Sequence, residues 1–276
     1  MGRDPAAGRD PTAGRDPTAG RGGGTTALPH SIGELARSAR RVLVLTGAGA
    51  SAESGVPTFR DAQTGLWERF DPLQLATPEA WAADPAQCFA WYAWRAALVR
   101  RAEPHAGHRA ITRWQQRDGV DLRVSTQNVD DLHERAGTQV MAHVHGDLFA
   151  LRCAECGMPS AAGYPEVPRP VERVDPPRCE RCGGLVRPGV VWFGEMLPEG
   201  ALEISVEAAR WAELVVVVGT SGLVYPAAAI PGVARDTGVP VVEVNPEGST
   251  LPDGADHVWP TTAARALPAL VDALEG

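Results

Sequence analysis

The chain contains no lysine, and each of its 26 basic residues is an arginine. Its 34 acidic residues outnumber them, so the formal net charge is -8 and the pI is about 5.4. A protein that binds nucleic acid through phosphate contacts needs a basic surface, so this charge balance argues against direct nucleic-acid binding. We attribute the absence of lysine to compositional bias, alongside 30 glycines and 24 prolines, and attach no function to it.

Long hydrophobic runs are also absent. No apolar stretch approaches the ~20 residues that cross a bilayer, and the N-terminus lacks the apolar segment of a signal peptide. We therefore expect a cytoplasmic protein without membrane contact. With 276 residues, 44% of them hydrophobic, the chain is long enough to bury a sizeable core in one large domain or two smaller ones.

The N-terminal segment has almost no apolar side chains. Residues 2–19 contain the units GRDPAA, GRDPTA and GRDPTA, and a glycine-rich run follows to Gly24. Such a segment cannot offset its own ordering entropy, so we expect residues 1–30 to form a disordered tail. Ser31 is a candidate N-cap with Glu34 as its capping-box partner, which predicts a short helix to Arg40.

A dinucleotide-binding pattern follows. The apolar run 42–45 predicts a buried parallel strand, and Gly47, Gly49 and Ala52 after it match G-x-G-x-x-A. In that motif small residues let backbone N–H groups approach a pyrophosphate at a helix N-terminus. The following segment, 55–61, is rich in breakers and predicts a long loop over the nicotinamide end of a cofactor. An ordinary strand, turn and helix without a ligand is the alternative.

Polar residues follow three more predicted strands, 122–126, 214–218 and 239–244. The strands are followed by Gln127, Asn128, Val129 and Asp130, by Gly219, Thr220 and Ser221, and by Asn245. Parallel strands of an open α/β sheet bind ligands at their carboxyl ends, and amide and carboxylate groups suit a ribose and a carboxamide. For Asp130 alone, capping of a helix at 131–135 is a plausible alternative.

Predicted helices alternate with these strands. Thr77-Pro78 and Asp84-Pro85 are helix starts, the second of a helix to Arg101. Further helices are expected at 105–116, 199–211, 226–237 and 262–273, and a further strand at 185–191. The alternation predicts an α/β protein with a Rossmann-like doubly wound parallel sheet.

Two histidines occur in the alternating segment 140–148. If this segment is one strand, His143 and His145 point to the same face. Gly146 lets the chain turn directly after His145, which leaves that imidazole at a strand end. An imidazole beside a ribose can act as general base on a hydroxyl, although a lone histidine is more often structural.

Four cysteines form two C-x2-C pairs, Cys153 with Cys156 and Cys179 with Cys182, and 22 residues separate the pairs. This spacing is typical of a zinc ribbon and favours one Zn²⁺ over disulfides in a cytosolic chain. Four protein ligands leave no open position on the metal, so the zinc is expected to be structural. Cys88 lies outside the pattern and is most simply a core residue.

Taken together, the motifs TGAGASAESGVPTFRD, TQNVDDLHERAG, HVHGDL, the four cysteines, GVVWFGEMLP, GTSGLVYPAA and VEVNPE resemble those of the sirtuins, the NAD-dependent protein lysine deacylases. The resemblance covers about residue 31 to the C-terminus, with the motifs in family order. It implies a catalytic domain at 31–276 with a Rossmann part (31–61, 104–150, 188–276) and a small helical and zinc-ribbon domain (62–103, 151–187). NAD, as co-substrate, and an acylated lysine of a substrate protein would meet in the cleft between them.

The resemblance also implies roles for individual residues. His145 matches the catalytic base, which deprotonates a ribose hydroxyl after the acyl oxygen has displaced nicotinamide. The acyl group then leaves as 2'-O-acyl-ADP-ribose. The implied NAD contacts are Gly47, Ala48, Gly49, Ala50, Ser51, Ala52, Glu53, Pro57, Thr58, Phe59, Arg60, Trp67, Gln127, Asn128, Val129, Asp130, Gly219, Thr220, Ser221, Asn245, Pro246, Glu247 and Ala263. The backbone of Val191, Trp192, Phe193 and Gly194 is expected to pair with the substrate chain.

Acyl-chain choice is predicted from Ala76, Tyr92 and Arg95. Tyr92 and Arg95 are three residues apart on one predicted helix, where an arginine can simply snorkel at the rim of the core. Ala76 with Tyr92-x-x-Arg95 resembles the signature of class III sirtuins. That resemblance implies a preference for succinyl-, malonyl- or glutaryl-lysine over acetyl-lysine.

Alternative functions are a plain deacetylase, a protein mono-ADP-ribosyltransferase and a non-catalytic NAD-responsive zinc module. A pure binding module has no need of a base beside the ribose, which argues against the last. The sequence leaves the oligomeric state open, and a monomer is compatible with it.

Overall fold

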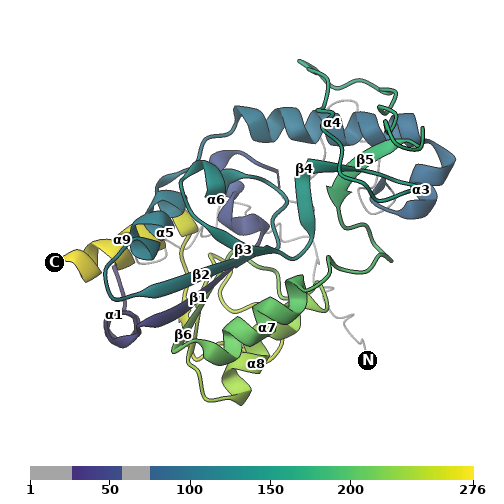
Figure 1. Cartoon of the computed structure of the whole chain (residues 1–276). Helices are drawn as coiled ribbons and strands as arrows, with labels where there is room; N and C mark the ends of the chain where they lie inside the picture. The colour runs from purple at the N-terminus through teal and green to yellow at the C-terminus, as the bar shows by residue number, and fades with distance from the viewer. Residues whose placement is uncertain (1–26, 58–74) are drawn as a thin grey trace, which may run out of the picture.

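The computed structural model describes residues 27–57 and 75–276 (Figure 1). The predicted disorder of residues 1–26 and the predicted loop contacts of Thr58, Phe59, Arg60 and Trp67 lie outside the described residues.

A six-stranded parallel sheet forms the centre of the molecule, with strand order β3-β2-β1-β6-β7-β8. Its strands are β1 (Arg41–Thr46), β2 (Asp121–Thr126), β3 (Val140–His143), β6 (Leu214–Val218), β7 (Val241–Val244) and β8 (His257–Trp259). The order reverses between β1 and β6, and this switch point is where open α/β sheets bind ligands beyond the carboxyl ends of their strands. The predicted doubly wound α/β fold is confirmed, although β8 was not predicted.

Helices cover both faces of the sheet. Successive residues of a strand point to opposite faces, so each face contributes to its own core. Val42 and Val44 pack into one core with α1 (His30–Ser38), α5 (Ala106–Gln115) and α9 (Ala263–Glu275). Leu43 and Leu45 pack into another with α7 (Ala201–Trp211) and α8 (Ile230–Asp236). In Figure 1 these two helix groups lie on either side of the sheet.

A smaller layer lies beyond the carboxyl ends of the strands and has its own core. It contains α3 (Pro78–Ala83), α4 (Pro85–Arg101) and the antiparallel pair β4 (Gly146–Cys153) and β5 (Val186–Val190), seen at the upper right of Figure 1. Both predicted helix starts are confirmed, since Thr77 and Asp84 accept hydrogen bonds from backbone N–H groups at the N-termini of α3 and α4.

Two local predictions were wrong. Helix α1 begins at His30 after Pro29, so Ser31 lies inside the helix, where its hydroxyl lies 3.3 Å from His257 Nδ1, and there is no capping box. The segment 140–148 is two strands rather than one: β3 ends at His143, and β4 begins after a turn that contains His145. Positive φ at Gly146 (78°) makes that turn, as its position predicted. The helix expected at 226–237 is confirmed: its first turn is 3₁₀, η4 (Ala227–Ala229), and it continues directly as α8.

Short helices complete the chain. They are η1 (Ala48–Ala50), η2 (Ala52–Ser54) and α6 (Leu132–Arg135). Among the described residues, no helix is both long and apolar enough to cross a bilayer.

Candidate functional site

A cleft of about 1470 Å³ lies between the carboxyl ends of the parallel strands and the small layer. Its lining includes every described residue predicted to contact NAD or substrate except Ala50. Ala50 is instead buried in the core under η1, where its carbonyl accepts a hydrogen bond from His105 Nε2 at 2.7 Å. The Ala50 side chain therefore lies in the core, and its predicted contact with NAD stays a prediction.

The glycines of the first strand turn serve the packing of two loops. A Cβ on Gly49 would lie 2.8 Å from the backbone of Gly219, and one on Gly219 would lie 2.3 Å from the Ala50 nitrogen. The amides of Gly47 and Gly49 donate to the carbonyls of Val218 and Gly219. Within the described residues 47–57 no α-helix N-terminus presents amides to a phosphate, because the turn leads into η1 and η2. The expected phosphate-binding helix start is therefore corrected, because the amides of Gly47 and Gly49 are hydrogen-bonded to the end of β6 and the loop after it.

His145 has one occupied and one open ring nitrogen. Its Nδ1 lies 3.2 Å from the Gln127 carbonyl, which can only accept, so Nδ1 carries the hydrogen and Nε2 the lone pair. Nε2 is buried and has no partner among the described residues. Burial lowers the pKa of His145, opposed by the Gln127 carbonyl, so the imidazole is neutral at neutral pH. The ring lines the cleft as a base with an open acceptor.

His143 is bonded at both ring nitrogens. Nδ1 lies 3.1 Å from the Asn128 carbonyl, and Nε2 lies 2.7 Å from Glu134 Oε1. Burial lowers the pKa of His143, but the Glu134 carboxylate and the Asn128 carbonyl outweigh it and raise the pKa overall. This histidine therefore stabilises the β2 and α6 connections rather than offering a free base.

The strand end after β2 is held in a fixed conformation. The side-chain Nδ2 of Asn128 donates to Ser51 Oγ at 3.0 Å, and the backbone N–H of Asn128 donates to Thr126 Oγ1. Asp130 Oδ1 accepts from the backbone N–H of Leu132, the first residue of α6, so Asp130 supports the start of this helix, although the N-cap position of the helix is Asp131. Burial raises the pKa of Asp130, partly offset by the hydrogen bonds from Leu132 and Ser51.

Two threonine hydroxyls add further polar groups to the lining of the cleft. Thr220 Oγ1 and Thr262 Oγ1 are buried and have no hydrogen-bond partner in the described part of the chain. Unpaired buried hydroxyls are costly, so both suit a ligand rich in acceptors, such as a dinucleotide. Asn245 binds the Thr220 carbonyl and Thr250 through its amide group and so fixes this loop. Thr262 was missed from the sequence, where it is simply the residue before the last helix.

The small-layer side of the cleft holds the predicted acyl-binding residues together. Ala76 and Tyr92 are buried and line it with Arg95, whose guanidinium carbon lies 5.1 Å from the centroid of the Trp91 ring. The amides of Val191 and Phe193 donate to the carbonyls of His145 and Ala76. Pairing of a substrate chain along this segment would therefore use its remaining backbone groups.

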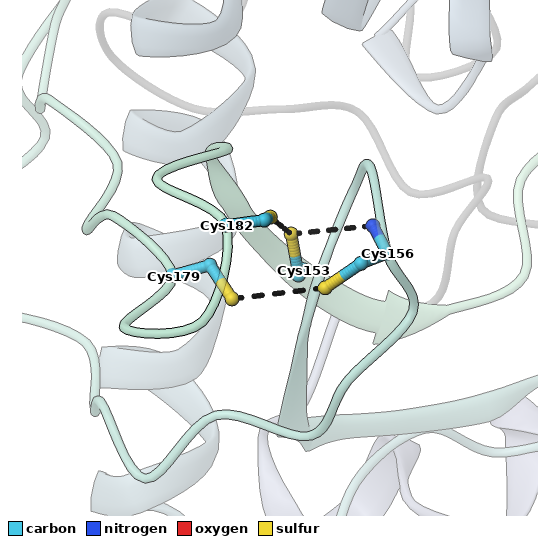
Figure 2. A group of neighbouring side chains, drawn as sticks. All are labelled: Cys153, Cys156, Cys179 and Cys182. Carbon is cyan, nitrogen blue, oxygen red and sulfur yellow. Dashed lines mark hydrogen bonds between the residues drawn. The ribbon is translucent and has the colours of Figure 1, made fainter.

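Figure 2 shows the four cysteines of the two pairs turned toward one another. Their Sγ atoms all lie within 4.8 Å, with Cys156 and Cys179 at 3.8 Å and Cys153 and Cys182 at 3.5 Å. Four thiolates about 2.3 Å from a tetrahedral Zn²⁺ would lie about 3.8 Å apart, so the cluster fits one zinc ion and no disulfide. Both turns end in a glycine of positive φ, Gly157 and Gly183, whose amides donate to the first cysteine of each pair. A closed site of four thiolates is structural.

Comparisons with known proteins agree with this architecture. The Sir2 family model matches residues 47–226. An NAD-dependent protein deacylase of Corynebacterium glutamicum is 49% identical over 251 residues, which cover 90% of this chain and 96% of the relative. The NAD-dependent protein deacylase of Mycobacterium tuberculosis is 52% identical over 234 residues, covering 85% and 98%. A solved Sir2 homologue in complex with NAD superimposes with a TM-score of 0.81 at 38% identity, covering 90% of this chain and 94% of that one. The chain therefore belongs to the Sir2 family.

Proposed function

We propose that the chain is an NAD-dependent protein lysine deacylase that removes acidic acyl groups in preference to acetyl. The observation that carries the proposal is the open, buried Nε2 of His145 in a cleft that is also lined by the unpaired hydroxyls of Thr220 and Thr262 and by the buried Tyr92. The named activity of the two relatives and the NAD complex of the structural neighbour support it.

In the proposed reaction the acyl oxygen bonds to the NAD ribose carbon as nicotinamide leaves. The neighbouring ribose hydroxyl then attacks the acyl carbon, and one water molecule completes the transfer, giving nicotinamide, deacylated lysine and 2'-O-acyl-ADP-ribose. His145 Nε2 accepts the proton of the ribose hydroxyl, and the Gln127 carbonyl holds Nδ1–H and stabilises the imidazolium. Ser51 orients the Asn128 amide toward the same end of the cleft. The Thr220 and Thr262 hydroxyls donate to the dinucleotide, while the closed cysteine site only supports the small layer.

The acyl preference rests on the residues at the small-layer side. The small Ala76 leaves space for a longer chain, and Arg95 can bind a carboxylate with two parallel hydrogen bonds. Tyr92 adds a hydroxyl. Charge-assisted hydrogen bonds contribute about 1.5 to 3 kcal/mol each, enough for a tenfold preference or more.

We further propose the division into a Rossmann part and a small domain at the boundaries stated above, and acylated lysines of other proteins as substrates. The separate core of α3, α4, β4 and β5 supports the division.

The proposed activity is tested by incubating the protein with NAD and matched succinylated and acetylated peptides, followed by mass spectrometry. Because the chain has no lysine, every deacylated lysine comes from the peptide. We expect deacylated peptide. ADP-ribosylated protein would indicate a transferase instead, and no NAD-dependent change would leave a binding module.

The proposed preference is tested by kcat/KM for the two peptides in the wild type and in Arg95→Met. We expect the succinyl to acetyl ratio to exceed ten and to fall in the variant. Equal values in the wild type, or an unchanged ratio in Arg95→Met, would make the protein a plain deacetylase.

A further inference from the structure

The Tyr92 hydroxyl oxygen already accepts a hydrogen bond, but its proton has no acceptor among the described residues. The side chain is 4% exposed, and its oxygen accepts the indole N–H of Trp192 at 2.9 Å. Indole nitrogen only donates, so the roles in this hydrogen bond are fixed. Within residues 27–57 and 75–276 no acceptor takes the Tyr92 proton, and the residue lines the cleft beside Arg95.

The proton stays on Tyr92 at neutral pH. Burial raises the pKa of the phenol, and the nearby charges of Arg95 and Arg187 and the bond from Trp192 only partly oppose it. A neutral phenol that already accepts one hydrogen bond is also a stronger donor, because hydrogen bonds in a chain polarise one another.

Trp192 is itself held rigidly. Its ring is 2% exposed, and the guanidinium carbon of Arg187 lies 3.2 Å from its centroid. Arg187 is bonded to both carboxylate oxygens of Glu195, and Glu195 Oε2 accepts the Trp192 amide at 2.9 Å. Trp81 packs against the same ring, with centroids 5.6 Å apart. The indole N–H is therefore aimed at Tyr92 before any ligand binds.

We propose that Trp192 is a positioning residue for acyl-chain selection: its indole N–H fills the acceptor site of Tyr92 and so directs the Tyr92 proton to the carboxylate of an acidic acyl group. The inference rests on the proposed function and deepens it. Without the indole N–H, the Tyr92 hydroxyl can rotate and donate its proton in another direction. Selection for the carboxylate would then weaken although Tyr92 and Arg95 are both present.

The test is the succinyl to acetyl ratio of kcat/KM in Trp192→Phe, in Tyr92→Phe and in the double variant. Trp192 also contributes to the substrate-binding segment, so absolute rates change, but a loss common to both peptides cancels in the ratio. We expect the ratio to fall about three- to tenfold in Trp192→Phe, through KM for the succinylated peptide, and the double variant to match Tyr92→Phe. Replacing Trp192 by benzothienylalanine, which has sulfur in place of the N–H, gives the same test with the packing preserved.

The possible results separate the inference from the proposed function. If the wild type prefers the succinylated peptide and Arg95→Met and Tyr92→Phe lower the ratio, but neither replacement of Trp192 does, the role of Trp192 is overturned and the function stands. Additive losses in the double variant would also overturn it, because Trp192 would then act independently of Tyr92. If the wild type shows no preference, the proposed acyl selectivity fails and the inference fails with it.

Discussion

His143 and His145 are two residues apart, yet their hydrogen bonds give them different chemistry. Both place Nδ1 against a backbone carbonyl, of Asn128 and of Gln127, but only His143 has a carboxylate on Nε2. Glycine at position 146 made a turn beside His145 predictable from the sequence, although β3 already ends at His143. The Glu134 partner was not, because it depends on how α6 packs against β3.

The residue-scale prediction concerns these two histidines. His145→Ala should lower kcat by about 10² to 10⁴ with NAD and peptide saturating, because the general base is lost. His143→Ala is the matched control and should retain most of the turnover. A His145→Ala variant with near-normal kcat would remove this residue from the chemistry.

At the scale of elements, local signals succeeded where a feature is closed within a few residues. Thr77 and Asp84 cap α3 and α4 as their spacing to proline indicates, and each C-x2-C turn closes on its own glycine. The turn after β1 could not be read in this way. Its amides are taken by Val218 and Gly219, which are distant in the sequence, and no local pattern encodes that contact.

The contact between Gly219 and the turn after β1 can be tested by substitution. Gly219→Ala should destabilise the protein by more than Gly238→Ala and should raise KM for NAD. Both glycines have positive φ (61° and 77°), for which an L-residue costs about 1 to 2 kcal/mol, but only Gly219 also meets backbone atoms. Denaturant unfolding of both variants measures the difference. Equal losses of stability would show that the two loops separate easily.

The second element-scale prediction concerns the metal. Purified protein should contain one zinc per chain, and Cys182→Ser should lose it, unfold the turns around 153–157 and 179–183 and lower activity indirectly. Cys88→Ala is the matched control, since Cys88 is buried outside the cluster, and it should bind zinc like the wild type. Metal analysis with thiol titration decides; free thiols in freshly purified wild type would contradict the assignment.

At the scale of the whole molecule, the alternation of strands and helices was sufficient to predict the doubly wound sheet and the meeting of four strand ends. It was not sufficient to predict β8, whose three residues give too short a pattern, or the cleft contact of Thr262. The hydrogen bond from the Trp192 indole to Tyr92 was not predictable either, since the two residues are 100 positions apart in the sequence. Long-range pairing determines these features.

The buried histidines predict how the stability of the whole molecule depends on pH. Burial lowers the pKa of His108 to about 2 and of His133 to about 4 from the ordinary 6.5. Below about pH 6.5 both histidines become protonated in the unfolded chain, whereas in the folded chain they stay neutral down to their lowered pKa values. The free energy of unfolding should therefore be highest above pH 6.5 and fall by about 1.4 kcal/mol per pH unit and histidine below it.

Urea unfolding between pH 5.5 and 7, with zinc present, measures this slope. His108→Gln should reduce this slope by one proton. A stability independent of pH in this window would mean that both histidines are solvated in the folded protein.

One NAD should be consumed for each acyl group transferred from lysine at the His145 cleft. The most direct measurement is the molar ratio of nicotinamide, deacylated peptide and 2'-O-acyl-ADP-ribose formed from NAD and a succinylated peptide, by mass spectrometry with labelled standards. We expect a ratio of one to one to one in the wild type, with all three products lost together in His145→Ala. Nicotinamide released without an equal amount of deacylated peptide, or deacylated peptide formed without NAD, would contradict it.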